Sequence, residues 1–241
     1  MTTNQAHKTL ACAACWIRLR SEWSALGPDE VEYLDGHRDE RVYAPRETLF
    51  RQGEDCRGLY CVEFGYLALR GTDALGNDTV FNLVGPGQTT GYRSLFAEEA
   101  HTATAQALTN ARVCFIPTEV LQHLLAGNAE LARRMLYTMA RDPGWRAATA
   151  LRSPKLSIRT RLVHVLLMLE EQFSSATGGG ARTYYLPLSR RDLADMIGAR
   201  VETVVRAIRK MENDGLATFE GQQVVVPALE HLRAQAALPS T

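Results

Sequence analysis

The stretch that decides the fold is residues 188–215, which read LSRRDLADMIGARVETVVRAIRKMENDG. Ser189, followed three residues later by Asp192, is a capping-box pattern, which starts a helix by satisfying free backbone amides. Gly198 tolerates the left-handed backbone that often ends a helix, and a second apolar stripe at helical spacing follows it. Two short helices joined by a tight turn are typical of a helix-turn-helix, whose second helix can enter a DNA major groove.

The residues on either side of this helix pair add short strands. Residues 216–226, LATFEGQQVVV, contain two β-rich runs around Gly221, which predict a hairpin wing. Residues 183–188, TYYLPL, offer a third short strand before the first helix. We therefore expect residues 153–241 to form a winged helix-turn-helix domain.

The sequence ARVETVVRAIRKMENDGL, residues 199–216, resembles the recognition helix of the Crp/Fnr family of transcription regulators. The resemblance covers most of the chain. It implies an α+β fold with a cyclic-nucleotide-binding-like β-roll, a long dimerisation helix and a C-terminal winged helix-turn-helix. It also implies a homodimeric regulator that binds palindromic double-stranded DNA, works with RNA polymerase and is not an enzyme.

Two residues of this helix correspond to the base-reading pair of the family, Glu202 and Arg206. An arginine can donate two hydrogen bonds to O6 and N7 of guanine, and a glutamate can accept one from N4 of cytosine. An alternative interpretation is an intrahelical ion pair, worth only about 0.2–0.5 kcal/mol. Val205 stands where the oxygen-sensing branch of the family has Ser, and Val201 where the cyclic-AMP receptor branch has Arg. A valine can only contact a thymine methyl or leave a base unread. The expected DNA-contacting residues are Glu202, Arg206, Val201, Val205, Arg200, Arg209, Ser189 and Arg190.

The charge of the chain is balanced as a whole but uneven along its length. Counted from Lys, Arg, Asp and Glu, the net charge is −5 for residues 1–120, +3 for residues 121–154 and +2 for residues 155–241. The positive charge lies in the C-terminal half, where a DNA-facing surface needs it. This excess of positive charge is too small to predict DNA binding by itself, so the prediction rests on the helix-turn-helix motif.

Two classes of protein are disfavoured by the sequence. It has no run of 18 apolar residues and no basic start followed by an apolar core, so we expect a cytoplasmic protein with neither membrane span nor signal peptide. It has no nucleophile with a base partner, no paired carboxylates with a reason to be perturbed and no phosphate loop, which disfavours an enzyme.

Short apolar runs separated by glycines extend from residue 42 to residue 117, and they predict an antiparallel barrel or sandwich. The family resemblance identifies residues 25–120 as the β-roll sensor domain. The nucleotide pocket of the family has a Glu after the glycine of its phosphate cassette and an Arg further on. This chain has Tyr92 after Gly91 and His101 in the later segment, so we do not expect it to bind cyclic AMP.

Residues 121–152 have a helical pattern, which the resemblance identifies as the dimerisation and linker helix. Within it, residues 142–145 read Asp-Pro-Gly-Trp. An interior proline removes one backbone hydrogen bond and clashes with the preceding turn, at a cost of about 3 kcal/mol. We therefore expect a kink near Pro143. Residues 157–173 follow as the first helix of the DNA-binding domain.

Five cysteines are present, and in a reducing compartment they more often serve as metal ligands, redox switches or core residues than as structural disulfides. The arm of residues 1–24 contains Cys12 and Cys15 in a C-x-x-C pair, which can chelate a soft metal. Residues 91–117 resemble the oxygen-sensing FNR branch of the family. That resemblance matches Cys12, Cys15 and Cys114 to three ligands of the iron-sulfur cluster of the branch.

The fourth ligand is left open, because Ser21 stands where the branch has its remaining cysteine, and the spare thiols are Cys56 and Cys61. A 4Fe-4S cluster needs four thiolates, or three with an oxygen or nitrogen donor. The expected metal ligands are Cys12, Cys15, Cys114 and Cys61.

The first hypothesis for the signal is a redox or gaseous one, sensed in the N-terminal domain. Three alternatives stay open. The cysteines can be small buried apolar residues, they can be a thiol switch without metal, or a small molecule bound inside the roll can control DNA binding.

Overall fold

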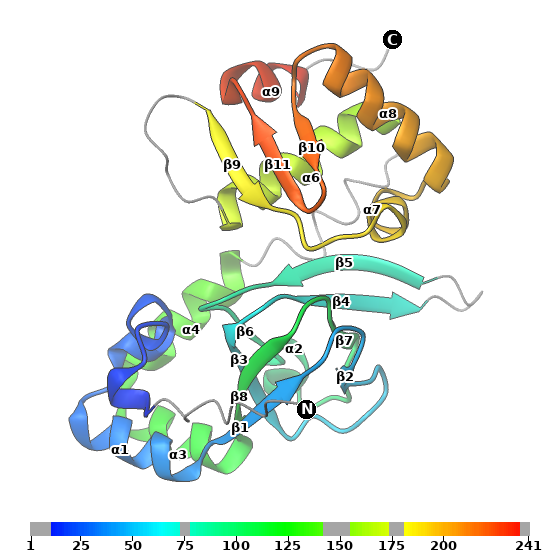
Figure 1. Cartoon of the computed structure of the whole chain (residues 1–241). Helices are drawn as coiled ribbons and strands as arrows, with labels where there is room; N and C mark the ends of the chain where they lie inside the picture. The colour runs from blue at the N-terminus through cyan, green and yellow to red at the C-terminus, as the bar shows by residue number, and fades with distance from the viewer. Residues whose placement is uncertain (1–10, 73–77, 142–154, 174–180, 237–241) are drawn as a thin grey trace, which may run out of the picture. The chain divides into compact units, whose positions relative to one another are not determined.

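A computed structural model describes residues 11–72, 78–141, 155–173 and 181–236 (Figure 1). The described residues separate into two compact units. The first is made of described residues within 1–67 and 84–142, and the second of described residues within 68–83 and 143–241. The kink expected near Pro143 lies outside the described residues.

Short helices and two sheets make up the N-terminal part of the chain. The helical elements are η1 (Cys12–Ala14), η2 (Arg18–Arg20), η3 (Glu22–Ala25), α1 (Pro28–His37), α2 (Tyr92–Ala97), α3 (Thr118–Gly127) and α4 (Ala129–Arg141). The strands are β1 (Asp39–Tyr43), β2 (Thr48–Phe50), β3 (Gly58–Phe64), β4 (Leu67–Thr72), β5 (Asp78–Val84), β6 (Thr89–Thr90), β7 (Thr104–Ala107) and β8 (Ala111–Pro117). Their orders are β1-β8-β3-β6 and β2-β7-β4-β5, which confirms the expected antiparallel roll.

The register of the first sheet decides which side chains meet on each of its faces. In the antiparallel pair β3–β8, Cys61 lies opposite Cys114 and Tyr60 lies opposite Phe115. Neighbouring residues of a strand point to opposite faces, so the two cysteines share one face and the two aromatic residues share the other. The cysteine face packs into a core with the N-terminal arm, α1, α3 and α4.

This core ties the N-terminal arm to the candidate dimerisation helix. Trp23 of the arm and Leu131 and Met135 of α4 all have 2% or less of their surface exposed and belong to the same cluster. Burying side chains of this size contributes about 1.5–3 kcal/mol each, so the arm and α4 are stabilised together.

The single helix expected over residues 121–152 is wrong in its first part, because the chain breaks at Asn128. There α3 ends at Gly127, and Asn128 has an extended backbone with φ −132° and ψ 90°. Its Oδ1 accepts a hydrogen bond from the backbone N–H of Leu131 at 2.8 Å, as an N-cap side chain does. The candidate dimerisation helix is therefore α4, as far as the described residues extend.

The C-terminal part is a winged helix-turn-helix, as expected. Its elements are α6 (Ile158–Phe173), β9 (Arg182–Tyr185), α7 (Arg190–Ile197), α8 (Val201–Asn213), β10 (Thr218–Glu220), β11 (Gln223–Val226) and α9 (Leu229–Ala236). The three strands lie side by side in the antiparallel order β10-β11-β9 (Figure 1). Among the described residues, no helix combines the length and the apolar character that crossing a membrane requires.

Candidate nucleic-acid interface and thiol site

The first helix of the motif begins at the capping box that its sequence predicts. The backbone N–H of Asp192 donates to Oγ of Ser189 at 3.1 Å, and the backbone N–H of Ser189 donates to Oδ2 of Asp192 at 2.9 Å. Both free amide donors at the start of α7 are thus satisfied. The cap fixes the residue at which α7 starts. The position of α7 in turn fixes the position of the turn that follows it and of α8.

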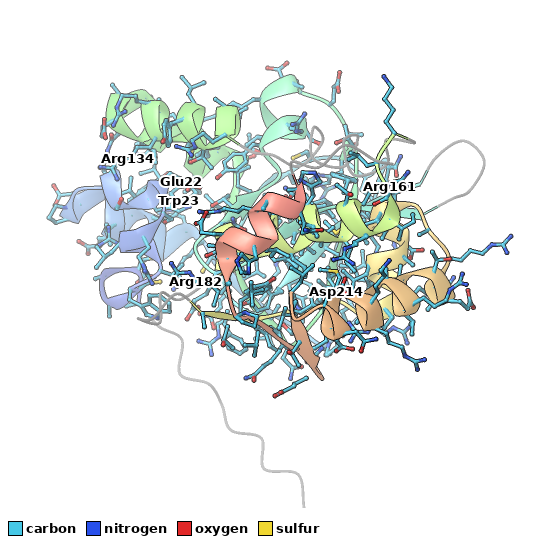
Figure 2. The ribbon with its side chains drawn as sticks, turned by 90° about the horizontal axis from the view of Figure 1, so that it is seen from above. Glu22, Trp23, Arg134, Arg161, Arg182 and Asp214 are labelled. Atoms are coloured by element: carbon cyan, nitrogen blue, oxygen red, sulfur yellow. The ribbon has the colours of Figure 1, made fainter. Side chains whose placement is uncertain are left out.

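The turn between the two helices is built by one glycine and one buried arginine. Gly198 has φ 65° and ψ 49°, the left-handed conformation that ends α7. Nη1 of Arg161 in α6 donates to the carbonyl oxygen of Ile197 at 3.0 Å, and only 9% of Arg161 is exposed. This positioning residue was not among the predicted site residues, although a cation within an apolar helix face is a visible signal in the sequence. Figure 2 labels Arg161 on α6 and Asp214 at the end of α8.

The recognition helix α8 has one buried and one exposed face. Val204, Ile208 and Met211 are at most 4% exposed and pack inward. The predicted contact residues lie on the opposite face or at its edge, and Val205 is half-buried there. The exposed ones are Val201, Glu202, Arg206 and Arg209.

The charged side chains on this exposed face are unpaired in the part of the chain that the structure describes. Within the described residues, no side-chain hydrogen bond or ion pair engages Arg200, Glu202, Arg206 or Arg209. Glu202 and Arg206 therefore do not form the intrahelical ion pair that was the alternative interpretation. By contrast, Arg159 of the same unit pairs with Asp214. Unpaired cations and a carboxylate on an exposed helix face are available to phosphates and base edges.

The last two predicted contact residues, Ser189 and Arg190, are engaged within the domain. The Ser189 hydroxyl serves the cap and donates to Oδ2 of Asp192 at 2.6 Å. The Arg190 guanidinium lies 5.0 Å from the centre of the Phe219 ring, a cation–π contact between α7 and the wing. Burial lowers the pKa of Arg190. Their contact with DNA stays a prediction.

Four cysteines from distant parts of the sequence gather near one another. Cys12 and Cys61 are buried in the core described above, and the half-buried Cys114 packs against it. Burial is the main cause of the raised pKa values of Cys61 and Cys114, and Cys15 lies close enough to both to add a small electrostatic contribution. We call Cys12, Cys15, Cys61 and Cys114 the thiol site. Cys56 lies apart from them, with its Sγ 3.6 Å from the carbonyl oxygen of Gly58.

An arginine that the sequence did not point to lies within the thiol site. Nη1 of Arg38 donates to Sγ of Cys114 at 3.1 Å, and its Nε donates to Oδ1 of Asp35 at 2.9 Å. The same carboxylate oxygen accepts the backbone N–H of Cys12 at 3.0 Å. The Arg38 side chain is only 5% exposed, so Arg38 and Asp35 join the arm to β8 from inside the protein.

Burial controls the protonation of these thiols. It raises the pKa of Cys12 from 9.0 to about 12, although the charge of Arg38 acts in the opposite direction. It raises the pKa of Cys114 to about 11, again against Arg38. Burial also raises the pKa of Cys61, and the negative charge of Glu22 adds to the effect. The three thiols are therefore neutral near pH 7 unless a bound cation displaces their protons.

The thiol site fits a soft metal by the type of its donors but not by their present arrangement. Four sulfur donors are the ligand set that an iron-sulfur cluster takes. Within the described residues, however, no three Cys, His, Asp or Glu side chains are placed to hold one metal ion. Arg38 contacts the sulfur of Cys114, so binding a cluster requires its guanidinium to move.

Family models match both parts of the chain. Residues 40–128 match a cyclic nucleotide-binding domain, and residues 160–235 match a Crp-like helix-turn-helix domain. The first match covers the strands of the roll, and the second covers the helix pair and the wing.

Individual proteins are similar over most of the length. The chain is 31% identical over 178 residues to the transcriptional activator protein FnrA of Stutzerimonas stutzeri, covering 74% of this chain and 72% of that protein. It is 24% identical over 226 residues to the fumarate and nitrate reduction regulatory protein of Salmonella typhimurium, covering 93% and 90%. The structure of FixK2 from Bradyrhizobium japonicum has a TM-score of 0.73 at 23% identity, covering 84% of this chain and 99% of that one, which shows the fold alone.

Proposed function

Because the chain belongs to the Crp/Fnr family of DNA-binding transcription regulators, which are not enzymes, we propose that its thiol site controls DNA binding in response to a redox or gaseous signal. The observation that carries the proposal is the gathering of Cys12, Cys15, Cys61 and Cys114 beside Arg38, next to the core that holds α4. The name of the fumarate and nitrate reduction regulatory protein refers to reduction, which supports a redox signal.

At the other end of the chain, we propose that α8 reads a palindromic operator as part of a homodimer. Arg206 donates two hydrogen bonds to guanine and Glu202 accepts one from cytosine, while Val201 and Val205 meet thymine methyls. The unpaired charges of Arg200 and Arg209 suit phosphate contacts, which position the helix without reading sequence. Ser189 and Arg190 contribute from α7. RNA polymerase is the expected partner of the bound dimer.

In the thiol site, the group that the residues would hold is a 4Fe-4S cluster, with Cys12, Cys15 and Cys114 as ligands and Cys61 as the fourth. When bound, the cluster would supply an oxidisable centre, and its cysteine ligands would add to the link between the arm and β8 that Asp35 and Arg38 already make. The protein contributes thiolates, and the Arg38 cation offsets part of their negative charge. Cys61 suits the fourth position because it lies opposite Cys114 in the sheet.

A thiol switch without metal is less well supported. The thiolate is the reactive form of cysteine, and reactive cysteines have lowered pKa values and access to solvent. Burial instead raises the pKa of Cys12 and Cys114, and Cys12 is only 7% exposed. A metal that binds sulfur would deprotonate these thiols outright.

The decisive experiment is anaerobic purification of the full chain, followed by iron and sulfide determination and an absorption spectrum. We expect about four irons per chain for a 4Fe-4S cluster. Cys114→Ala should lose both the iron and the signal-dependent DNA binding. Cys56→Ala is the matched control, since Cys56 contacts Gly58 instead of the thiol site. Protein that carries no iron, together with a Cys114→Ala variant that responds normally, would reject the proposal.

A small-molecule regulator is the second candidate function, and a cleft in the roll favours it. The cleft has a volume of about 1070 Å³, and its lining includes Phe50, Tyr60, His101 and Phe115. The rings of Phe50 and His101 stack at 3.7 Å, and the Arg41 guanidinium lies 4.4 Å from the centre of the Phe115 ring. Aromatic walls suit a small aromatic ligand, and the lining also holds charges of both signs, among them Arg41, Glu54 and Asp55. A thermal shift with small aromatic compounds but not with cyclic AMP would support this candidate, and no shift with any of them would reject it.

A further inference from the structure

Four consecutive residues of the N-terminal arm join the roll to α4. They form η3, Glu22–Ala25, and each one has a hydrogen bond to the roll, to α4 or to the residue that caps α4. We call these four residues the arm clasp. The function proposed above uses none of their side chains, so these contacts need a separate explanation.

Two residues of the arm clasp bind the roll. Tyr92 in α2 donates its hydroxyl proton to Oε1 of Glu22, and Nε1 of Trp23 donates to Oγ1 of Thr89 in β6 at 3.1 Å. All four side chains are at most 7% exposed. A carboxylate buried in a core is strongly unfavourable unless it is hydrogen-bonded. The docked position of the arm therefore depends on the Tyr92 hydroxyl.

The other two residues of the arm clasp bind α4. Oγ of Ser24 accepts a hydrogen bond from Nη1 of Arg134 in α4 at 2.5 Å. The carbonyl oxygen of Ala25 accepts one from Nδ2 of Asn128 at 3.1 Å, and Asn128 is the residue that caps α4. One short turn thus connects to the first half of α4 at two points.

We propose that the arm clasp holds α4 against the roll, so that undocking of the arm releases α4. Because Glu22 and Ser24 belong to one tight turn, a break on the roll side loosens the contacts on the α4 side as well. Figure 2 shows Glu22 and Trp23 of the arm in the same region as Arg134 of α4. The link itself stands without the thiol chemistry, and only its use as a signal route from Cys12 and Cys15 rests on the proposed function.

The first test compares two neighbouring arginines of α4 by hydrogen exchange of the full chain, without iron or DNA. Arg133 and Arg134 both pair with Glu130 at 2.7 Å, but among the described residues only Arg134 has a hydrogen bond to the arm. In Arg134→Met we expect the amides of residues 22–25 to exchange about tenfold faster, the effect of losing one hydrogen bond to a charged group. Arg133→Met should leave their exchange unchanged. Equal effects of the two variants would overturn the proposal.

The second test breaks the arm clasp on its roll side and measures the response of α4. Tyr92→Phe removes the hydroxyl that binds Glu22, and Tyr92 has no hydrogen bond to α4 in the described part of the chain. We expect faster exchange both in residues 22–25 and in the first half of α4. A response confined to the arm would overturn the proposal. If Tyr92→Phe does not fold, Thr89→Val, which removes the acceptor for Nε1 of Trp23 on the same roll side, answers the same question. Since no iron or DNA is present, this outcome is independent of the sensing function.

Discussion

Arg206 is the residue expected to read a guanine, because its exposed guanidinium can donate two hydrogen bonds to O6 and N7 of the base. The substitution Arg206→Lys keeps the positive charge but removes the two-donor fork that matches guanine. We expect the affinity for a selected operator to fall by about 1–3 kcal/mol per half-site, with non-specific affinity nearly unchanged. Fluorescence anisotropy with operator and scrambled duplexes at one salt concentration measures both quantities.

Lys210→Met is the control for this prediction, since Lys210 is exposed on the same helix but lies outside the predicted reading set. It should change both affinities slightly and by similar factors. If Arg206→Lys also weakened the two duplexes equally, Arg206 would be a phosphate contact, and the reading of α8 proposed here would be wrong.

The protonation of the thiol site is a second property of single residues. Burial raises the pKa of Cys12 to about 12 and that of Cys114 to about 11, from 9.0 in the unfolded chain. A thiol whose folded pKa is raised stabilises the fold fully below the unfolded value and loses this contribution as the pH rises through the folded value. We therefore expect the iron-free protein to lose stability as the pH rises above 9 toward 11 and 12.

Denaturant unfolding across this range measures the loss, and the thiolate absorbance of Cys12→Ser and Cys114→Ser variants assigns it. Each variant should remove one late step of the thiolate titration and reduce the loss of stability. A thiolate already present at neutral pH on Cys114 would contradict the expectation and favour a metal-free thiol switch.

At the scale of the elements, two glycine turns of the roll give a matched comparison. Gly65 and Gly87 both have φ +85°, where an L side chain costs about 1–2 kcal/mol. A Cβ at Gly65 would lie 2.2 Å from the carbonyl oxygen of Asn110, whereas none of the neighbouring atoms comes within 4 Å of a Cβ at Gly87. We expect Gly87→Ala to cost about 1–2 kcal/mol of unfolding free energy, and Gly65→Ala clearly more. Urea unfolding of both variants checks this, and equal losses would mean that the turn after β3 can rearrange.

At the scale of the whole molecule, we expect a homodimer formed through residues 128–151, of which residues 128–141 are described. Leu136 and Tyr137 of α4 are 66% and 57% exposed, which leaves apolar surface for a second copy to cover. Two-fold symmetry matches a palindromic operator with half-sites one helical turn apart. Leu136→Glu should shift the protein toward monomer and weaken operator binding, as sedimentation velocity and footprinting would show.

Leu19→Glu is the control for the dimer, because Leu19 is 62% exposed in η2, outside α4. It should remain dimeric. A wild-type protein that is monomeric at micromolar concentration and protects one half-site would contradict the assembly.

The sequence by itself determined the winged helix-turn-helix and the antiparallel roll. Its signals are local: the Ser189–Asp192 cap, the left-handed Gly198, the apolar period of α8 and the regular turns of the roll. Each depends on residues a few positions apart, so the chain carries the information without its tertiary contacts. The exposed face of α8 follows from the same periodicity.

Only the tertiary structure decided what surrounds these elements. The pairing of Cys61 with Cys114 depends on the register of β3 and β8, and the contact of Arg38 with Cys114 joins residues 76 positions apart. The arm clasp likewise joins Ser24 to Arg134, 110 positions away. Such contacts depend on how separate elements pack together, and a pattern read over a few neighbouring residues does not contain this information. The same holds in part for the break at Asn128 within the expected long helix, because Nδ2 of Asn128 donates to the Ala25 carbonyl and to Oε2 of Glu30, 103 and 98 positions away.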